Sequence, residues 1–183
     1  GLRATSWALL HGEREHGISW PEVTPGIDEG RLLAQVAVPI TDDDTALTLN
    51  AKCFEAAAAA FERVLAAMES GVAVLTPQQG PRSYFGGADR PAAQCILDPE
   101  RPARTIVDLV RALDFGHAPN PLGLPKLWLG ERTVVVRRAK AAAAASTAAA
   151  GTVLGVDAGA VRLATGTTDV ELAALADLDG RPL

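Results

Sequence analysis

The sequence predicts two packed regions, an incomplete α/β domain followed by a small β-barrel. Three observations predict this class: strand-like segments lead into a long helical pattern, a Pro- and Gly-rich stretch follows, and five short strand-like runs come last. We therefore predict that residues 1–74 end the α/β domain, residues 75–98 form a linker, and residues 99–183 form a helix plus the barrel.

The first elements are a helix and a pair of strands. Residues 1–17 carry an apolar run that stops at a polar stretch, which predicts a helix and then a turn. Residues 18–23 form a short run bounded by Gly and Pro, and residues 31–40 are rich in Leu, Val and Ala, which predicts two strands flanking a loop. Pro21 lies in the first strand and cannot donate a ladder hydrogen bond, so we expect an edge or a bulge there.

A long helix follows and is predicted to end near Gly71, because apolar residues recur at three- and four-residue spacing after Thr45. Its start carries three aspartates, residues 42–44. We expect them and Thr45 to accept hydrogen bonds from the amides of the first turn and to complement the helix dipole. Three adjacent aspartates are not spaced like a calcium-binding EF-hand loop, so metal binding is the disfavoured reading.

The back half begins with an amphipathic helix over residues 102–115, with proline at its first position and Gly116 as its stop. Five strands are then predicted, each closed by a Gly-bearing turn: 126–129, 133–139, 151–156, 160–164 and 170–174. The alanine-rich residues 141–150 carry no apolar stripe, and we predict a loop.

Composition narrows the class of protein. The chain is 48% hydrophobic with a mean hydropathy of +0.14, and it has no apolar run near the roughly 20 residues that span a bilayer. These features predict a soluble, cytoplasmic protein without a membrane partner. Two isolated cysteines, Cys53 and Cys95, predict neither a disulfide framework nor a metal site.

Charge disfavours nucleic acid as a partner. The net charge is -5. Residues 1–98 hold 7 Lys and Arg against 13 Asp and Glu, whereas residues 99–183 hold 10 against 9. Proteins that grip a nucleic-acid backbone concentrate cations on one face. Only four cations cluster here, and we expect them on the solvent side of a strand pair: Arg132, Arg137, Arg138 and Lys140.

One segment, residues 16–30, carries a candidate catalytic group. No phosphate-binding Gly-rich loop, nucleophile elbow or metal-spaced cluster is present. Asp28 follows Ile27 and precedes Gly30 at the end of a loop between two predicted strands. From the residues alone, an Asp in this setting is a turn former or a catalytic carboxylate, and both readings stay open.

The segment from Gly1 to Gln35 resembles the formyltransferase family, which includes methionyl-tRNA, glycinamide ribonucleotide and sugar-nucleotide formyltransferases. The resemblance continues through Asp44-Thr45, Val110-Arg111-Ala112 and the terminal segment that begins at Gly151. Two stretches, residues 42–53 and 111–123, are similar to formyltransferase-like domains fused to non-ribosomal peptide synthetases. The resemblance implies the C-terminal part of a Rossmann-like formyltransferase domain, followed by a small, open, OB-like β-barrel, that is, one of the oligonucleotide/oligosaccharide-binding type.

By this resemblance, Asp28 is the family's catalytic aspartate and works with an asparagine and a histidine of an Asn-x-His segment upstream of Gly1. The formyl donor would be 10-formyltetrahydrofolate, with no metal. Four loop residues would offer backbone groups to its pterin ring: Thr24, Pro25, Gly26 and Ile27. Because the implied upstream half is a partner of this site, we expect the chain to be inactive alone.

The acceptor implied by the resemblance is a small-molecule or carrier-tethered amine, in a non-ribosomal peptide or related biosynthetic pathway. Methionyl-tRNA formyltransferase is one alternative, and a non-catalytic scaffold remnant is another. Pro21 occupies a position where many relatives carry histidine. Three histidines, His11, His16 and His117, are predicted to lie exposed at turns and not to replace the missing one.

Overall fold

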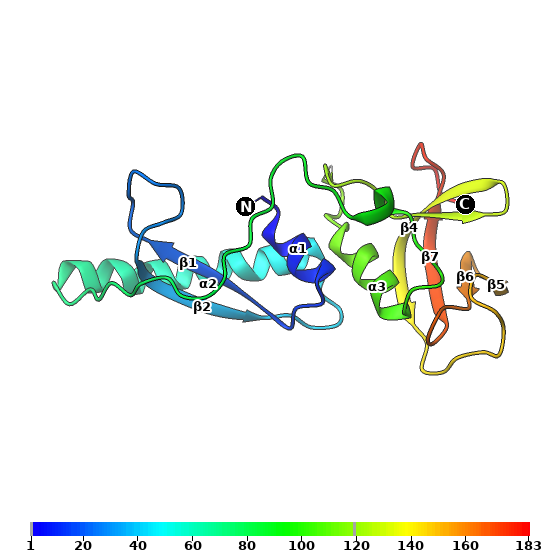
Figure 1. The fold of residues 1–183 in the computed structure, drawn as a ribbon, viewed down its shortest axis with the longest axis horizontal. Helices are drawn as coiled ribbons and strands as arrows, with labels where there is room; N and C mark the ends of the chain where they lie inside the picture. Colours follow the sequence, from blue (N-terminus) through cyan, green and yellow to red (C-terminus); the bar gives the residue numbers. More distant parts are fainter. Residues whose placement is uncertain (1, 119) are drawn as a thin grey trace.

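The computed structural model describes residues 2–118 and 120–183. Figure 1 shows a two-stranded hairpin lying along a long helix at one end of an elongated molecule and a five-stranded sheet at the other. Two shorter helices, α1 and α3, lie between them. The predicted class, part of an α/β domain plus a small barrel-like domain, is confirmed.

The front region begins with α1 (Ala4–Leu10), β1 (Glu15–Pro21) and β2 (Leu32–Pro39). β1 and β2 pair antiparallel, and the register shifts between Trp20 and Pro21. The predicted irregularity at Pro21 is therefore confirmed, since a proline interrupts the ladder there.

The long helix α2 (Ala46–Glu69) begins with a capping box. The Thr48 amide donates to Thr45 Oγ1 (3.3 Å), and the Thr45 amide donates to Thr48 Oγ1 (2.9 Å). Among the described residues, no amide of the first turn donates to the three aspartates, which corrects the prediction for residues 42–44. The Asp42 carboxylate accepts from Arg14 and Arg104, and the Asp44 carboxylate accepts from the Lys52 ammonium and from Thr41. The face of α2 toward β2 buries small and aliphatic residues: Ala46, Leu49, Cys53, Ala60 and Val64.

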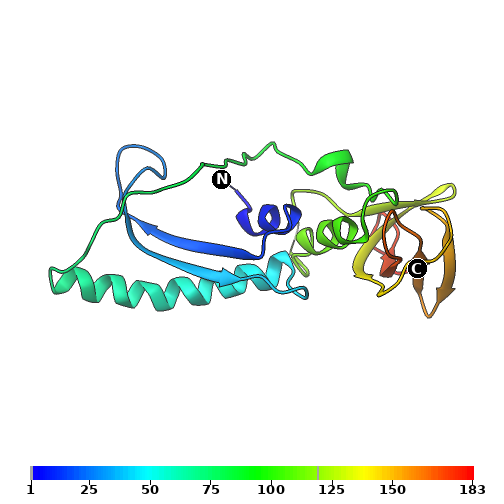
Figure 2. The same ribbon diagram turned by 60° about the horizontal axis from the view of Figure 1, so that its bottom comes forward.

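Residues 75–98 contain one short element, the 3₁₀ turn η1 (Ala92–Cys95). Figure 2 shows this segment returning from the far end of α2 past the base of the loop that joins β1 and β2. Thr76 forms a bridge with Leu32, and further on the Phe85 ring stacks on Trp7 with centroids 4.4 Å apart. The segment therefore runs over the surface in contact with the front region.

The back region comprises α3 (Ala103–Ala112), β3 (Lys126–Leu129), β4 (Arg132–Ala141), β5 (Val153–Asp157), β6 (Ala160–Leu163) and β7 (Val170–Ala176). The strands form one antiparallel sheet in the order β3-β4-β7-β6-β5. All five predicted strands are present, and residues 142–150 form no helix or strand. The helix ends three residues earlier than predicted, because the chain turns at Gly116 (φ 62°) and the Gly116 amide donates to Asp114 Oδ1.

A buried arginine joins the two regions. Arg111 of α3 is 6% exposed, and its Nη1 donates to the carbonyl of Thr41 (2.8 Å) in the segment before α2. Its Nε donates to Asp108 Oδ1 (2.8 Å). Helix α3 also packs against α1 and β4, so it contacts both the front region and the barrel.

Candidate active-site loop

The loop between β1 and β2, residues 22–31, is closed at its neck by one residue pair. The Glu22 amide donates to the Arg31 carbonyl (2.9 Å), and Arg31 Nε donates to Glu22 Oε2 (2.7 Å). The hydrogen bond from Arg31 lowers the pKa of Glu22. Gly30 lies so close to the neck that an added Cβ would overlap the Glu22 carbonyl oxygen. Only glycine fits there.

Asp28 lies on the exposed side of this loop. Its backbone adopts the left-handed conformation (φ 55°), which Asp tolerates better than most residues. Among the described residues its carboxylate makes no hydrogen bond or ion pair, so the turn-former reading, in which that carboxylate binds its own backbone, has no support in the geometry.

The four predicted folate-binding residues lie beside Asp28. The Thr24 hydroxyl donates to the Gly26 carbonyl (3.3 Å), and Ile27 is 78% exposed. Arg82 Nη2 donates to the Ile27 carbonyl, while no hydrogen bond within the described residues uses the amides of Ile27 and Asp28. Within the described residues, these two amides are among several backbone donors of the loop that have no partner.

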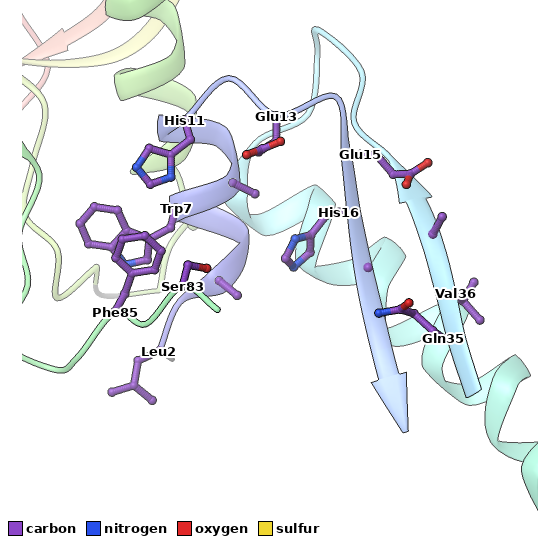
Figure 3. A pocket seen from close by; sticks show the side chains of 14 residues that line it. Leu2, Trp7, His11, Glu13, Glu15, His16, Gln35, Val36, Ser83 and Phe85 are labelled. Carbon is purple, nitrogen blue, oxygen red and sulfur yellow. The ribbon is translucent and has the colours of Figure 1, made fainter. Parts of the chain in front are cut away.

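A cleft of about 580 Å³ lies elsewhere, at the end of the hairpin away from this loop. Figure 3 shows Trp7, His11 and Phe85 on one side of it and His16 on β1 at the other. His16 precedes Pro21 by five residues of extended strand, about 17 Å. The cleft and the Asp28 loop are therefore separate features of the hairpin.

The placement of His16 corrects a prediction. His16 lies within β1 and is half-buried, whereas His11 and His117 are exposed at turns as predicted. Burial lowers the pKa of His16, and the nearby Glu13 carboxylate opposes this. His16 lines the cleft and does not belong to the Asp28 loop.

Metal ligation has no candidate in the described part of the chain. No group of three or more His, Cys, Asp or Glu side chains there is placed to hold an ion. Cys53 and Cys95 are free, and burial raises the pKa of both thiols. Across residues 2–118 and 120–183, every helix is too short or too polar to cross a bilayer.

Two family models match the chain. A formyl transferase model matches residues 1–65, and a model of the formyl transferase C-terminal domain matches residues 91–183, which is more than half of the chain. The chain belongs to the formyltransferase family.

Solved structures with the same fold include HypX from Aquifex aeolicus in complex with tetrahydrofolic acid (19% identity, TM-score 0.67, 96% of this chain and 30% of that one). WlaRD, a sugar 3N-formyl transferase crystallised with dTDP and 5-N-formyl-THF, aligns at 15% identity and a TM-score of 0.69 over 94% of this chain and 60% of its own. Methionyl-tRNA formyltransferase from Clostridium thermocellum aligns at 18% identity and a TM-score of 0.51, over 92% of this chain and 60% of its own. The chain thus spans less than two thirds of each of these proteins.

Sequence reasoning missed two residues that touch the loop. Gln78 and Arg82 donate hydrogen bonds to its backbone from residues 75–98. Their segment has no periodicity, and they lie about fifty positions from their partners in the sequence. The proline and glycine content of this segment was the only signal, and it indicated a linker draped over a surface, without naming its partners.

Proposed function

We propose that this chain forms part of a folate-dependent formyltransferase that moves a formyl group from 10-formyltetrahydrofolate to an amine, with Asp28 as its catalytic carboxylate. The proposal rests on one observation in a chain of the formyltransferase family. The Asp28 carboxylate is exposed, has no partner among the described residues, and lies on a loop whose backbone is fixed by hydrogen bonds. In this proposal residues 1–74 end the catalytic domain, residues 75–98 form the linker, and residues 99–183 form the C-terminal domain.

The loop suits one wall of a folate site. A pterin ring carries a carbonyl oxygen and several N–H groups, so it needs donors and acceptors arranged side by side. The amides of Ile27 and Asp28 are free to donate, and the carbonyls of Thr24 and Pro25 are free to accept. HypX and WlaRD, which share the fold, were crystallised with tetrahydrofolic acid and 5-N-formyl-THF. The remaining walls would come from the upstream half of the domain.

The chemistry requires a carboxylate at such a place. When the folate is bound it supplies the formyl carbon. The attacking amine acquires a positive charge and must lose a proton, which a nearby carboxylate accepts directly or through a water molecule or histidine that it orients. An aspartate with an exposed carboxylate serves either role. Asp28 would therefore act on the proton, and donors for the formyl oxygen would come from the upstream asparagine and histidine.

The acceptor that we propose is an amine on a carrier-tethered or small biosynthetic substrate. Residues 42–53 and 111–123, which resemble the domains fused to non-ribosomal peptide synthetases, support a carrier-tethered amine. WlaRD, which is a sugar 3N-formyl transferase, supports a small-molecule amine. The excess of acidic residues in the front half argues against RNA.

The test is formyl transfer by the full-length protein, measured with labelled 10-formyltetrahydrofolate and a panel of amines. Asp28→Asn should lower kcat by at least about a hundredfold and leave the unfolding temperature unchanged, because the amide keeps the shape of the carboxylate. Glu29→Gln is the matched control, a neighbouring exposed carboxylate, and should transfer at the wild-type rate. Wild-type turnover in Asp28→Asn would remove the assignment, and absence of turnover with every amine would favour a scaffold.

Methionyl-tRNA is the second candidate acceptor, because exposed cations gather on the outer face of the barrel. On β4 Arg138 and Lys140 are exposed. In the strand register Lys140 lies opposite Glu171 of β7, and Arg162 of β6 lies opposite the same Glu171. Three cations thus lie on neighbouring strands of the sheet. Retention of tRNA at 0.15 M salt, lost in Arg138→Glu, would favour this acceptor over a small amine.

A further inference from the structure

The linker holds the candidate catalytic loop through two side chains. Gln78 donates from one nitrogen, Nε2, to the carbonyl oxygens of Asp28 (3.0 Å) and Gly30 (2.7 Å). Arg82 Nη2 donates to the carbonyl oxygen of Ile27 (2.9 Å). A bridge between Leu32 and Thr76, with backbone hydrogen bonds of 2.7 and 2.9 Å, aligns the linker beside β2 at the same level.

These contacts act on the two peptide groups that flank the Asp28 Cα. The Ile27 carbonyl belongs to the peptide group before it, and the Asp28 carbonyl belongs to the one after it. The φ and ψ angles of Asp28 are the relative rotations of these two planes, so a donor on each plane fixes both angles. Asp28 needs this support because its left-handed conformation is unfavourable for a residue with a Cβ.

The backbone angles also fix the direction in which a side chain leaves the chain. If φ of Asp28 returned to a negative value, its carboxylate would project from another side of the loop. Catalytic groups must be held within a fraction of an ångström, and misplacement by about 1 Å costs up to about a hundredfold in rate.

We propose that Gln78 and Arg82 are positioning residues for formyl transfer, which set the direction of the Asp28 carboxylate through the backbone of its loop. The inference rests on the proposed function, since it matters for catalysis only if Asp28 acts on the substrate. Both side chains are exposed and lie in an irregular segment, so their hydrogen bonds contribute to the geometry of the loop far more than to global stability.

The test uses the full-length protein with Gln78→Glu, Gln78→Ala and the control Gln79→Glu. Glutamate has the shape of glutamine but donates no hydrogen bond when ionised, so it places negative charge beside two carbonyl oxygens. We expect both Gln78 variants to lose about ten- to a hundredfold in kcat, with Gln78→Glu at least as impaired as Gln78→Ala. Gln79 is adjacent and exposed, and its side chain makes no hydrogen bond to the described residues, so Gln79→Glu should match wild type.

Arg82 supplies a rescue experiment. Arg82→Ala should lower kcat, and Arg82→Lys should recover part of the loss, because an ammonium group can donate to the Ile27 carbonyl. The proposal would be overturned if Arg82→Lys and Arg82→Ala had the same kcat but different unfolding temperatures. That result would mean that the arginine side chain acts only on stability.

Hydrogen exchange gives a readout that does not depend on activity. The amides of Glu22, Leu32 and Thr76 are hydrogen-bonded at the neck of the loop and at the linker bridge, and they should exchange faster in Gln78→Glu than in Gln79→Glu, while those of α2 should be unchanged. Inactive Asp28→Asn together with Gln78 variants within twofold of wild type would overturn the positioning role and leave the proposed function standing. Wild-type turnover in Asp28→Asn would remove the proposed function and this inference with it.

Discussion

Asp44 gives the sharpest test of how the front region is stabilised. Its carboxylate is buried and accepts hydrogen bonds from Lys52 Nζ (2.7 Å), the Thr41 amide (2.7 Å) and the Thr48 hydroxyl (3.0 Å). Burial by itself raises the pKa of Asp44. The hydrogen bonds from Lys52, Thr41 and Thr48 outweigh burial and lower the pKa from 3.8 to about 2.

The difference between the folded and unfolded pKa of Asp44 gives the size and sign of its contribution to the folding free energy. A pKa lowered from 3.8 to about 2 corresponds to about 2 kcal/mol of folding free energy, since one pKa unit is worth about 1.4 kcal/mol. The folded pKa lies below the unfolded one, so this stability is present above pH 3.8 and is lost as the pH falls through about 2. At pH 3 about 1 kcal/mol of it is already gone.

The assay is urea unfolding of wild type and Asp44→Asn between pH 6 and pH 3, with exposed Asp43→Asn as the control. The difference in unfolding free energy between wild type and Asp44→Asn should shrink by about 1 kcal/mol over this range. The difference between wild type and the control should change far less. If the Asp44→Asn difference stays constant with pH, then Lys52 and Thr41 do not favour the ionised carboxylate, and the reasoning fails.

Two further changes test the packing. Arg111→Met should lower the unfolding free energy by about 3 kcal/mol in urea titrations, because it leaves Asp108 and the Thr41 carbonyl without this buried donor. A loss below about 1 kcal/mol would contradict the role of Arg111 as the link between the regions. Gly166→Ala should destabilise the folded protein by about 1–3 kcal/mol, since the added Cβ would overlap the Glu100 carbonyl oxygen. Gly155→Ala is the control, because its Cβ enters open space. Equal unfolding temperatures for the two variants would refute this contact.

The elements of this fold are predictable from local pattern. All seven strands and the three α-helices carry alternation, helical spacing or turn residues that the sequence displays within ten to twenty positions. The error at the start of α2 has a physical cause. Asp44 and Thr45 are both good caps, but Thr45 forms a reciprocal pair with Thr48, which leaves Asp44 free to bind Lys52.

Only part of the candidate site could be predicted from the sequence. Asp28 and its loop stand out through Gly26, Gly30 and the flanking strands, and the role assigned to Asp28 stays a prediction. Gln78 and Arg82 were not visible, because a hydrogen bond across some fifty residues leaves no local pattern. His16 was misplaced because the strand begins at Glu15, three residues before the apolar residues that mark it.

The hydrogen bonds from Arg111 to the segment before α2 limit where parts of two related proteins can be joined into one chain. A crossover placed in residues 75–98 looks convenient, because that stretch lacks regular structure, yet it would separate the guanidinium from the carbonyls that it contacts at Thr41, Asp42 and Asp44. In a chimaera assembled from two relatives, the arginine of one relative would have to fit the segment before α2 of the other. Exchange of the back region between relatives should therefore succeed only where residues 41–44 travel together with α3.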